Sequence, residues 1–335
     1  MLENRTSSSI AIRGNQTQHS QPVSRKALHD ASSRINGAHE FSKTNVMKTI
    51  PENMKEIEEP NQILKPSRLG EIDDPQDAYD FDLEVYQTMK REERVDLPNP
   101  DYFEQQTSIT PKMRTIVFDW LVDVHGKLGF HTDTLYLTMN IIDRYLSIIS
   151  LDKTQFQKFA CAATLIAAKN LELYTPSLRD LVQLADRSFT TTQLAEAEAE
   201  MMSALDFRIN PFLPSMFLKR YLRIMQPDFH LSMVSHYILE TTILDQKFIG
   251  ETPSKLAAAA VCLAATLYRG TGQWTEEAIS NTGFTIDDLT DLIQKLLNCV
   301  NTTVASRYTA IRRKYSGKEM DNVSGIRYPE LMNAF

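Results

Sequence analysis

The chain has 335 residues, of which 42% are hydrophobic, and a formal net charge of −7 at pH 7. The length allows about two domains, and the negative charge disfavours a general nucleic-acid binder, which needs a clustered basic face for phosphates. No apolar run resembles a signal peptide or is long enough to span a bilayer. The three cysteines lack CxxC spacing, so neither zinc binding nor a disulfide framework is indicated. We expect an intracellular protein without membrane or nucleic-acid partners.

The N-terminal part of the chain changes character near Pro75. Residues 1–72 are rich in polar and charged residues without a sustained period, which predicts a disordered regulatory tail. Apolar residues then recur at helical spacing and predict a short amphipathic helix: Phe81, Val85, Tyr86 and Met89. The next segment, Leu97 to Gln106, holds two prolines and is expected to be extended.

A set of five helices is predicted next. Thr110 is the expected N-cap of the first, with Pro111 at its first position and Gly129 at its end. One apolar face runs through this helix: Met113, Ile116, Val117, Trp120, Leu121, Val124 and Leu128. The remaining four have expected start signals at the following residues: Thr132 or Asp133, Asp152, Ser177 with Asp180, and Thr190.

An alanine-rich segment occurs twice, as Phe159 to Lys169 and as Leu256 to Thr266, at a constant offset of 97 residues. Small side chains suit a helix that other helices approach closely, so the duplication predicts two five-helix domains in an all-α protein. The second set is expected near residues 214–226, 229–247, 253–269, 274–281 and 286–315. The copies differ at their last position, which makes Lys169 a candidate functional residue.

No catalytic motif is present. The sequence lacks a phosphate loop, a GxSxG elbow, an HExxH pair and kinase catalytic segments, so we expect no catalytic residue, metal or cofactor. Charged residues within the apolar helices point instead to structure or protein binding: Arg114, Asp143, Lys169 and Glu198. Arg114 and Asp143 are expected to pair between the first two helices and to set their register.

Several segments resemble the cyclin boxes of mitotic cyclins, in particular the B-type. They are MRTIVFDWLVDV from Met113, TLYLTMNIIDRYLS from Thr134, the first alanine segment, FIGETPSKLAAAAVCLA and GQWTEEAISNTGF. The resemblance covers about residues 75–320. It implies two tandem five-helix cyclin folds, the first with the N-terminal helix in 73–210 and the second in 211–320, and a C-terminal tail in 321–335. It also implies a non-catalytic subunit that activates a PSTAIRE-type cyclin-dependent kinase at the G2/M transition and in mitosis.

The resemblance further assigns two surfaces. Lys169 and Glu198 would hold the mobile helix of the kinase, with apolar contacts from Val85, Phe207 and Ile209. A substrate-docking patch would bind Arg-x-Leu substrates or inhibitors through six residues: Met113, Ile116, Trp120, Asp123, Phe156 and Gln157. Phe156 replaces the usual leucine and Asp123 the usual glutamate, so we expect an altered preference. Core packing is the alternative for the apolar members of both surfaces.

The tail segment RKALHDASS resembles the mitotic destruction box, which implies that Arg25 and Leu28 are recognised by the mitotic ubiquitin ligase. Ser33 departs from the usual asparagine there.

Asn170 and Leu171 replace the usual aromatic residue and glutamate after Lys169, which leaves the choice of kinase open. We expect the protein in both nucleus and cytoplasm. The alternative function is a transcription adaptor built on the same repeat, similar to transcription factor IIB, which would require basic surfaces on the repeats.

Overall fold

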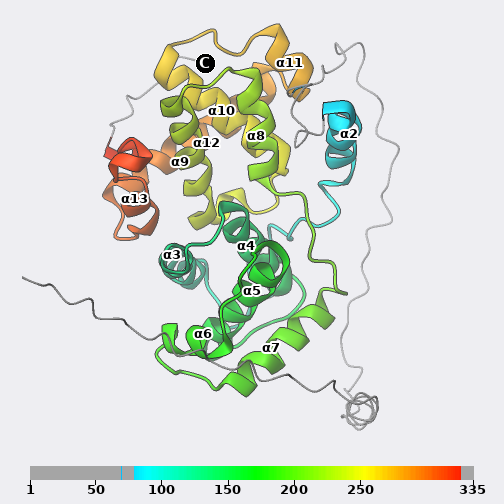
Figure 1. The fold of residues 1–335 in the computed structure, drawn as a ribbon, viewed down its shortest axis with the longest axis vertical. Coiled ribbons are helices and arrows are strands. Elements are labelled where there is room, and N and C mark those ends of the chain that lie inside the picture. The colour runs from blue at the N-terminus through cyan, green and yellow to red at the C-terminus, as the bar shows by residue number, and fades with distance from the viewer. Residues whose placement is uncertain (1–68, 70–78, 326–335) are drawn as a thin grey trace, which may run out of the picture. The chain divides into compact units, whose positions relative to one another are not determined.

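The structure is a computed structural model that describes Leu69 and residues 79–325. Helices joined by short loops make up this part of the chain, and no β-strand occurs in it, as the all-α prediction requires (Figure 1). Except for Leu69, the predicted regulatory tail lies outside the described residues, and so does the destruction-box segment.

Two sets of five α-helices follow one another. The first set comprises α3 (Pro111–Leu128), α4 (Thr132–Leu146), α5 (Phe156–Leu171), α6 (Leu178–Leu184) and α7 (Thr191–Ala204). The second comprises α8 (Pro214–Ile224), α9 (Phe229–Thr241), α10 (Pro253–Arg269), α11 (Glu276–Thr282) and α12 (Ile286–Ala305). The short helix α2 (Asp82–Glu92) precedes them and α13 (Ala310–Lys314) follows. The predicted duplication of a five-helix unit is confirmed.

The two alanine-rich helices, α5 and α10, are the central helices of their sets. α5 packs against α4 and α7, and α10 packs against α8, α9 and α12. Their alanines are fully buried, including Ala160 and Ala163 in α5 and the aligned Ala257 and Ala260 in α10. Because a methyl group takes little room, the neighbouring helices can approach closely. The repeat in the sequence therefore marks the core of each set.

Three of the five start signals predicted for the first set are the observed N-caps, whereas Asp152 caps the 3-10 turn η3 (Lys153–Gln155) that precedes α5. These three side chains accept a hydrogen bond from the backbone amide three residues on: Thr110, Ser177 and Thr190. The start of α4 differs, because the ring nitrogen Nδ1 of His131 accepts the amide of Asp133. His131 is therefore the cap, and the prediction of Thr132 or Asp133 is wrong by one or two residues.

Two helices of the second set are shorter than predicted. α9 ends at Thr241, and two 3-10 turns follow it, η4 (Thr242–Leu244) and η5 (Gln246–Phe248). Between them Asp245 is extended and its side chain accepts the amide of Lys247. α12 likewise stops at Ala305, and the hydroxyl of Ser306 accepts the amide of Tyr308. Such local side-chain bonds compete with helix continuation, and helical periodicity alone does not reveal them.

Helix α2 precedes the first set in sequence but packs against the second (Figure 1). The Glu93 carboxylate accepts hydrogen bonds from the backbone amide and the hydroxyl of Ser254, at 2.8 and 2.7 Å, at the start of α10. Tyr86 donates to the carbonyl oxygen of Thr282 at 3.0 Å. Glu93 thus supplies the acceptor that α10 lacks at its own N-cap, Thr252.

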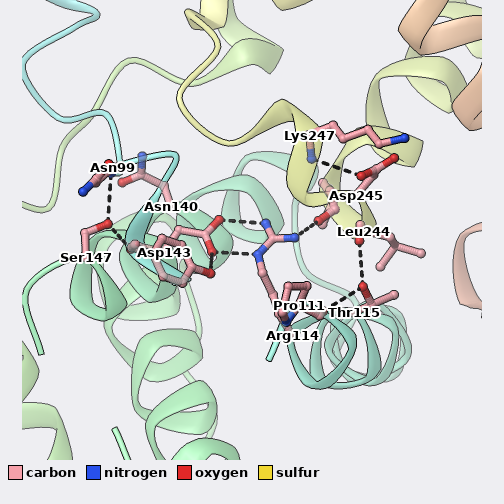
Figure 2. Close-up of polar contacts among 12 residues, drawn as sticks. Asn99, Pro111, Arg114, Thr115, Asn140, Asp143, Ser147, Leu244, Asp245 and Lys247 are labelled. Carbon is pink, nitrogen blue, oxygen red and sulfur yellow. Dashed lines mark hydrogen bonds and ion pairs between the residues drawn. The ribbon is translucent and has the colours of Figure 1, made fainter. Parts of the chain in front are cut away.

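A buried ion pair joins the first two helices of the first set (Figure 2). Arg114 of α3 donates from Nε and Nη2 to the two carboxylate oxygens of Asp143 on α4, at 2.8 and 2.7 Å. The two side chains are only 3% and 7% exposed, and the predicted pairing is present. Burial lowers the pKa of Arg114, but the charge and hydrogen bonds of Asp143, with smaller contributions from Tyr102 and Asp245, together raise it above its usual value.

Asp143 also binds a residue in the segment that was expected to be extended. Tyr102 is fully buried and its hydroxyl donates to Oδ1 of Asp143 at 2.9 Å. The chain forms a 3-10 turn there, η2 (Tyr102–Glu104), so the prediction of a wholly extended stretch from Leu97 to Gln106 is wrong. A buried tyrosine hydroxyl needs a hydrogen-bond partner, and the turn lies where Tyr102 meets that partner.

Arg114 also contacts the second set of helices. Its Nη1 donates to the carbonyl oxygen of Ile243 at 3.0 Å, and the adjacent Thr115 donates to that of Leu244 at 3.0 Å (Figure 2). Both carbonyls belong to η4, where α9 has ended and its last carbonyl groups need partners. The Arg114–Asp143 pair therefore connects α3, α4 and the second set at one point.

Replacing Asp143 with alanine should destabilise the protein strongly, because Arg114 would stay buried without its carboxylate. A loss of about 3–5 kcal/mol in the free energy of unfolding is expected, measured by chemical denaturation of the full chain. Glu251→Ala is the control, since it removes the partner of the half-exposed Lys295 at 3.4 Å, and it should cost less than about 1 kcal/mol. Equal losses in the two variants would contradict the role of the buried pair.

Candidate functional site

Lys169 and Glu198, which the resemblance assigned to one binding surface, lie side by side. Lys169 is in the last turn of α5 and Glu198 is on the neighbouring α7 (Figure 1). Nζ of the lysine is 2.6 Å from Oε1 of the glutamate, and the lysine and glutamate side chains are 52% and 18% exposed. An exposed pair of this kind contributes at most about 1 kcal/mol to stability. The fold therefore has little need of these two residues, which leaves them available for binding.

At the end of α10 that aligns with the Lys169 end of α5, the polar side chains are hydrogen-bonded within the second set. Thr266, which aligns with Lys169, is 6% exposed and its hydroxyl donates to the carbonyl oxygen of Cys262. The helix continues to Arg269, whose guanidinium donates to the backbone carbonyl oxygens of Met225 and Gln226. The polar groups at this end are used within the second set, so the asymmetry seen in the sequence is also an asymmetry of exposure.

The linker after α7 lies beside the end of α5. Asn170 donates from its amide nitrogen to the side-chain oxygen of Asn210 at 2.7 Å, which ties the linker to α5. Phe207 is 68% exposed and has a φ of +57°, a conformation that bulky residues rarely adopt. Ile209 is partly buried against the core, so core packing accounts for part of its surface. Ile209 thus lies near the end of α5, where it lines a small cavity with Asn170 and Leu171.

Two further apolar residues next to Lys169 were missed by the sequence reasoning. Leu173 and Tyr174 follow the end of α5 and are 86% and 84% exposed. Large apolar side chains gathered at a surface indicate an interaction site. The sequence did carry a signal for them, because these large apolar residues stand outside any helical period and just before Pro176. The remaining predicted residue, Val85, is exposed on α2.

A second surface is an apolar cavity of about 420 Å³ between α3 and the start of α5. It is lined by seven residues: Met113, Ile116, Val117, Trp120, Lys153, Phe156 and Gln157. Five of these were predicted, and Val117 and Lys153 were missed. Their positions could have indicated them, because Val117 is four residues after Met113 and Lys153 three before Phe156. We call this cavity the groove.

Asp123, the sixth predicted docking residue, does not line the groove. It stands one turn beyond Trp120 on α3, and both of its carboxylate oxygens accept from Nη2 of Arg313 at 2.6 Å. Hydrogen bonding to Asp123 raises the pKa of Arg313. Arg313 belongs to α13, which packs against α3. Helical spacing places Asp123 on the face of the groove, but the contact with Arg313 spans 190 residues and is outside the reach of pattern reasoning.

Within residues 79–325, no cluster of three or more histidine, cysteine or acidic side chains could hold a metal ion. Cys161, Cys262 and Cys299 are buried free thiols, and burial raises the pKa of each, to about 12, 12 and 11. The helices described here include none with the length and apolar character of a membrane span.

Comparison with known proteins places both five-helix sets in one family. Residues 84–210 match the family described as Cyclin, N-terminal domain, and residues 212–329 match Cyclin, C-terminal domain. Among solved structures, a viral cyclin from herpesvirus saimiri has the same fold, with a TM-score of 0.58 and 20% identity over 64% of this chain and 96% of that one. A chain of the yeast RNA Pol II CTD kinase CTDK-1 complex aligns at a TM-score of 0.50 and 13% identity over 64% and 72% of the two chains.

Curated relatives agree with this assignment. G2/mitotic-specific cyclin-B of Marthasterias glacialis is 32% identical over 77% of this chain and 66% of its own length. Cyclin-B2-1 of Oryza sativa subsp. japonica is 31% identical over 78% and 63%, and G2/mitotic-specific cyclin-B2 of Bos taurus is 30% identical over 76% and 64%. The chain therefore spans just under two thirds of the length of these relatives. It belongs to the cyclin family, with both cyclin domains in tandem and mitotic B-type cyclins among its relatives.

Proposed function

We propose that this chain is a regulatory subunit that binds and activates a PSTAIRE-type cyclin-dependent protein kinase at the G2/M transition and in mitosis. The kinase would supply the ATP site and the catalytic residues. The tandem cyclin domains and the mitotic relatives support this function. The observation that carries it is the surface pair of Lys169 and Glu198, together with the exposed side chains of Leu173 and Tyr174, four and five residues after Lys169 in the chain.

The first box, with its N-terminal helix in residues 73–210, is the part that we assign to kinase binding. Its α5 ends in an exposed lysine, whereas α10 ends in groups already bonded within the second set. The second box, residues 211–320, then supports the first through the contacts of Arg114 and Thr115 with η4.

The proposed contact is with the mobile helix of the kinase. A lysine ammonium has three donors, of which one is used by Glu198, and the others can bind carbonyl groups left free at a helix end. Glu198 can accept backbone amides in the same way, and hydrogen bonds to charged groups are strong. Phe207, Leu173 and Tyr174 would be covered by the partner. Setting this helix positions the kinase glutamate against its ATP-binding lysine, an ion pair that phosphoryl transfer requires.

Lys169→Ala and Glu198→Ala should each weaken kinase binding by about tenfold or more, the equivalent of one charge-assisted hydrogen bond. Histone phosphorylation by the purified pair should fall accordingly. Thermal unfolding should stay close to that of the unmodified chain, because the pair is exposed. Lys295→Ala, at another exposed pair, is the matched control. Full activation by both test variants would reject the roles assigned to these residues.

We also propose that the groove docks Arg-x-Leu substrates or inhibitors. Its lining is apolar and open, with Ile116 46% exposed. Nearly half of the Ile116 side chain is exposed, which favours binding at this residue, whereas Phe156 is 3% exposed and packs in the core. A docked leucine would bury this surface from water, which is favourable in proportion to the apolar area covered.

Ile116→Ala should raise the KM for a protein substrate that carries the docking motif by about fivefold to tenfold, since about 1 kcal/mol of apolar burial is lost. Phosphorylation of a short peptide without the motif should not change. Ile148→Ala removes the same side chain from a site outside the groove where it is 55% exposed, and it should leave both substrates unaffected. An equal change for both substrates would argue against docking at the groove.

For the tail we propose a destruction box at Arg25 and Leu28, read by the mitotic ubiquitin ligase, and residence in both nucleus and cytoplasm. These residues lie outside the described part of the chain, and the proposal is supported only by the resemblance of RKALHDASS.

Replacing both Arg25 and Leu28 with alanine should lengthen the half-life of the chain at mitotic exit severalfold, measured by a chase after synthesis is blocked. Arg34→Ala, which lies just after this segment, is the control. Unchanged decay of the double variant would exclude the segment as a degradation signal.

A further inference from the structure

Asp123, which stands on α3 one turn beyond the groove, is already bound by another part of the chain. Nη2 of Arg313 binds both carboxylate oxygens of Asp123 at 2.6 Å, and Nη1 of the same guanidinium donates to the Thr309 hydroxyl at 3.1 Å. Asp123 is the residue to which the arginine of a docked Arg-x-Leu peptide would bind. A basic residue of a ligand must therefore displace Arg313 before it reaches this carboxylate.

Arg313 is held in place by the anchoring of α13. The backbone amide of Ala310 donates to Oδ1 of Asp119 on α3 at 2.9 Å. On the other side, Lys314 and Tyr315 bind Oε1 of Glu240 at 2.6 and 2.8 Å, and Glu240 is fully buried. Because the helix is fixed on both sides of Arg313, the guanidinium stays close to Asp123 and competes as an intramolecular partner with a high effective concentration.

The opposite end of the groove carries a free cation. The backbone amide of Lys153 donates to the hydroxyl of Ser108 at 3.0 Å, so this residue lies near the start of α3, at the Met113 end. Its side chain is exposed and forms no ion pair within the described part of the chain, since the neighbouring Asp152 interacts with it only through its charge and accepts its hydrogen bonds from Thr154. Met113 and Asp123 are ten residues apart, about 15 Å along the helix, which four or five residues of an extended peptide would span.

We infer that this groove selects a short peptide with apolar anchors and a carboxylate at the Lys153 end, and that Arg313 suppresses recognition of a basic residue at the Asp123 end. The charges at the two ends support this occupant, with an unpaired ammonium at one end and a neutralised carboxylate at the other. The inference rests on the proposed docking function and changes its ligand chemistry. It gives Arg313, outside the groove, the role of a specificity-determining residue.

Binding of labelled peptides to the full chain, followed by fluorescence anisotropy, tests this inference. The peptides share one apolar core and carry arginine, glutamate or alanine at either flank. The unmodified chain should bind the glutamate peptide about fivefold more tightly than the alanine peptide. Its affinity for the arginine peptide should lie within about twofold of its affinity for the alanine peptide. Lys153→Ala should remove the preference for glutamate.

Arg313→Ala should raise the affinity for the arginine peptide about fivefold, because Asp123 becomes available. Arg312→Ala, the neighbouring exposed arginine on the same helix, is the matched control and should behave like the unmodified chain. In the double variant with Asp123→Asn the gain should disappear, which separates the release of Asp123 from a general loosening of α13.

Three results would overturn the inference. One is a preference of the unmodified chain for the arginine peptide that Arg313→Ala does not increase, and another is a gain that survives in the double variant. The third is that no peptide binds and that Ile116→Ala leaves the KM for the substrate with the docking motif unchanged. This result would reject the docking function as well. Kinase activation is measured separately, as phosphorylation of a short peptide without the docking motif, and does not depend on these outcomes.

Discussion

The buried Arg114–Asp143 pair is the contact on which the arrangement of the two boxes depends. Two charges removed from water are tolerated only where good geometry and further hydrogen bonds compensate for the lost hydration. Here Tyr102 and the carbonyl of Ile243 provide them, so the pair requires α3, α4, η2 and η4 to meet at one place. Because α3 also carries the groove, the position of the groove relative to both boxes follows from this contact.

Helix α5 links the two proposed binding surfaces. Phe156 and Gln157 at its start line the groove, and Lys169 in its last turn faces the proposed kinase site. The helix has 16 residues and is therefore about 24 Å long. Its alanines are packed on several sides, which leaves little freedom to bend. A substrate docked at one end would thus be held at a constant distance from a kinase bound at the other.

Much of the architecture could be predicted from local patterns. Thr110, Ser177 and Thr190 act as helix caps because a side-chain oxygen three residues before a free amide needs no distant partner. The alanine repeat indicated the central helices because small residues matter wherever helices cross. Two helix ends were misplaced, at Asp245 and Ser306, where a local hydrogen bond ends a helix whose apolar period continues. Periodicity reports which face is buried, and a single side-chain bond decides where the helix stops.

The sequence by itself determined the all-α class and the duplication, because both depend on spacing within helices and between repeats. Charged residues within apolar helices indicated the Arg114–Asp143 pair, and the cyclin resemblance indicated most of the groove. Only the tertiary structure decided that Lys169 contacts Glu198, that Leu173 and Tyr174 after α5 are exposed, and that Arg313 holds Asp123. These contacts join residues far apart in the chain or depend on what covers a loop. Helical spacing carries no information about either, so the ligand chemistry of the groove becomes visible only when α13 is seen against α3.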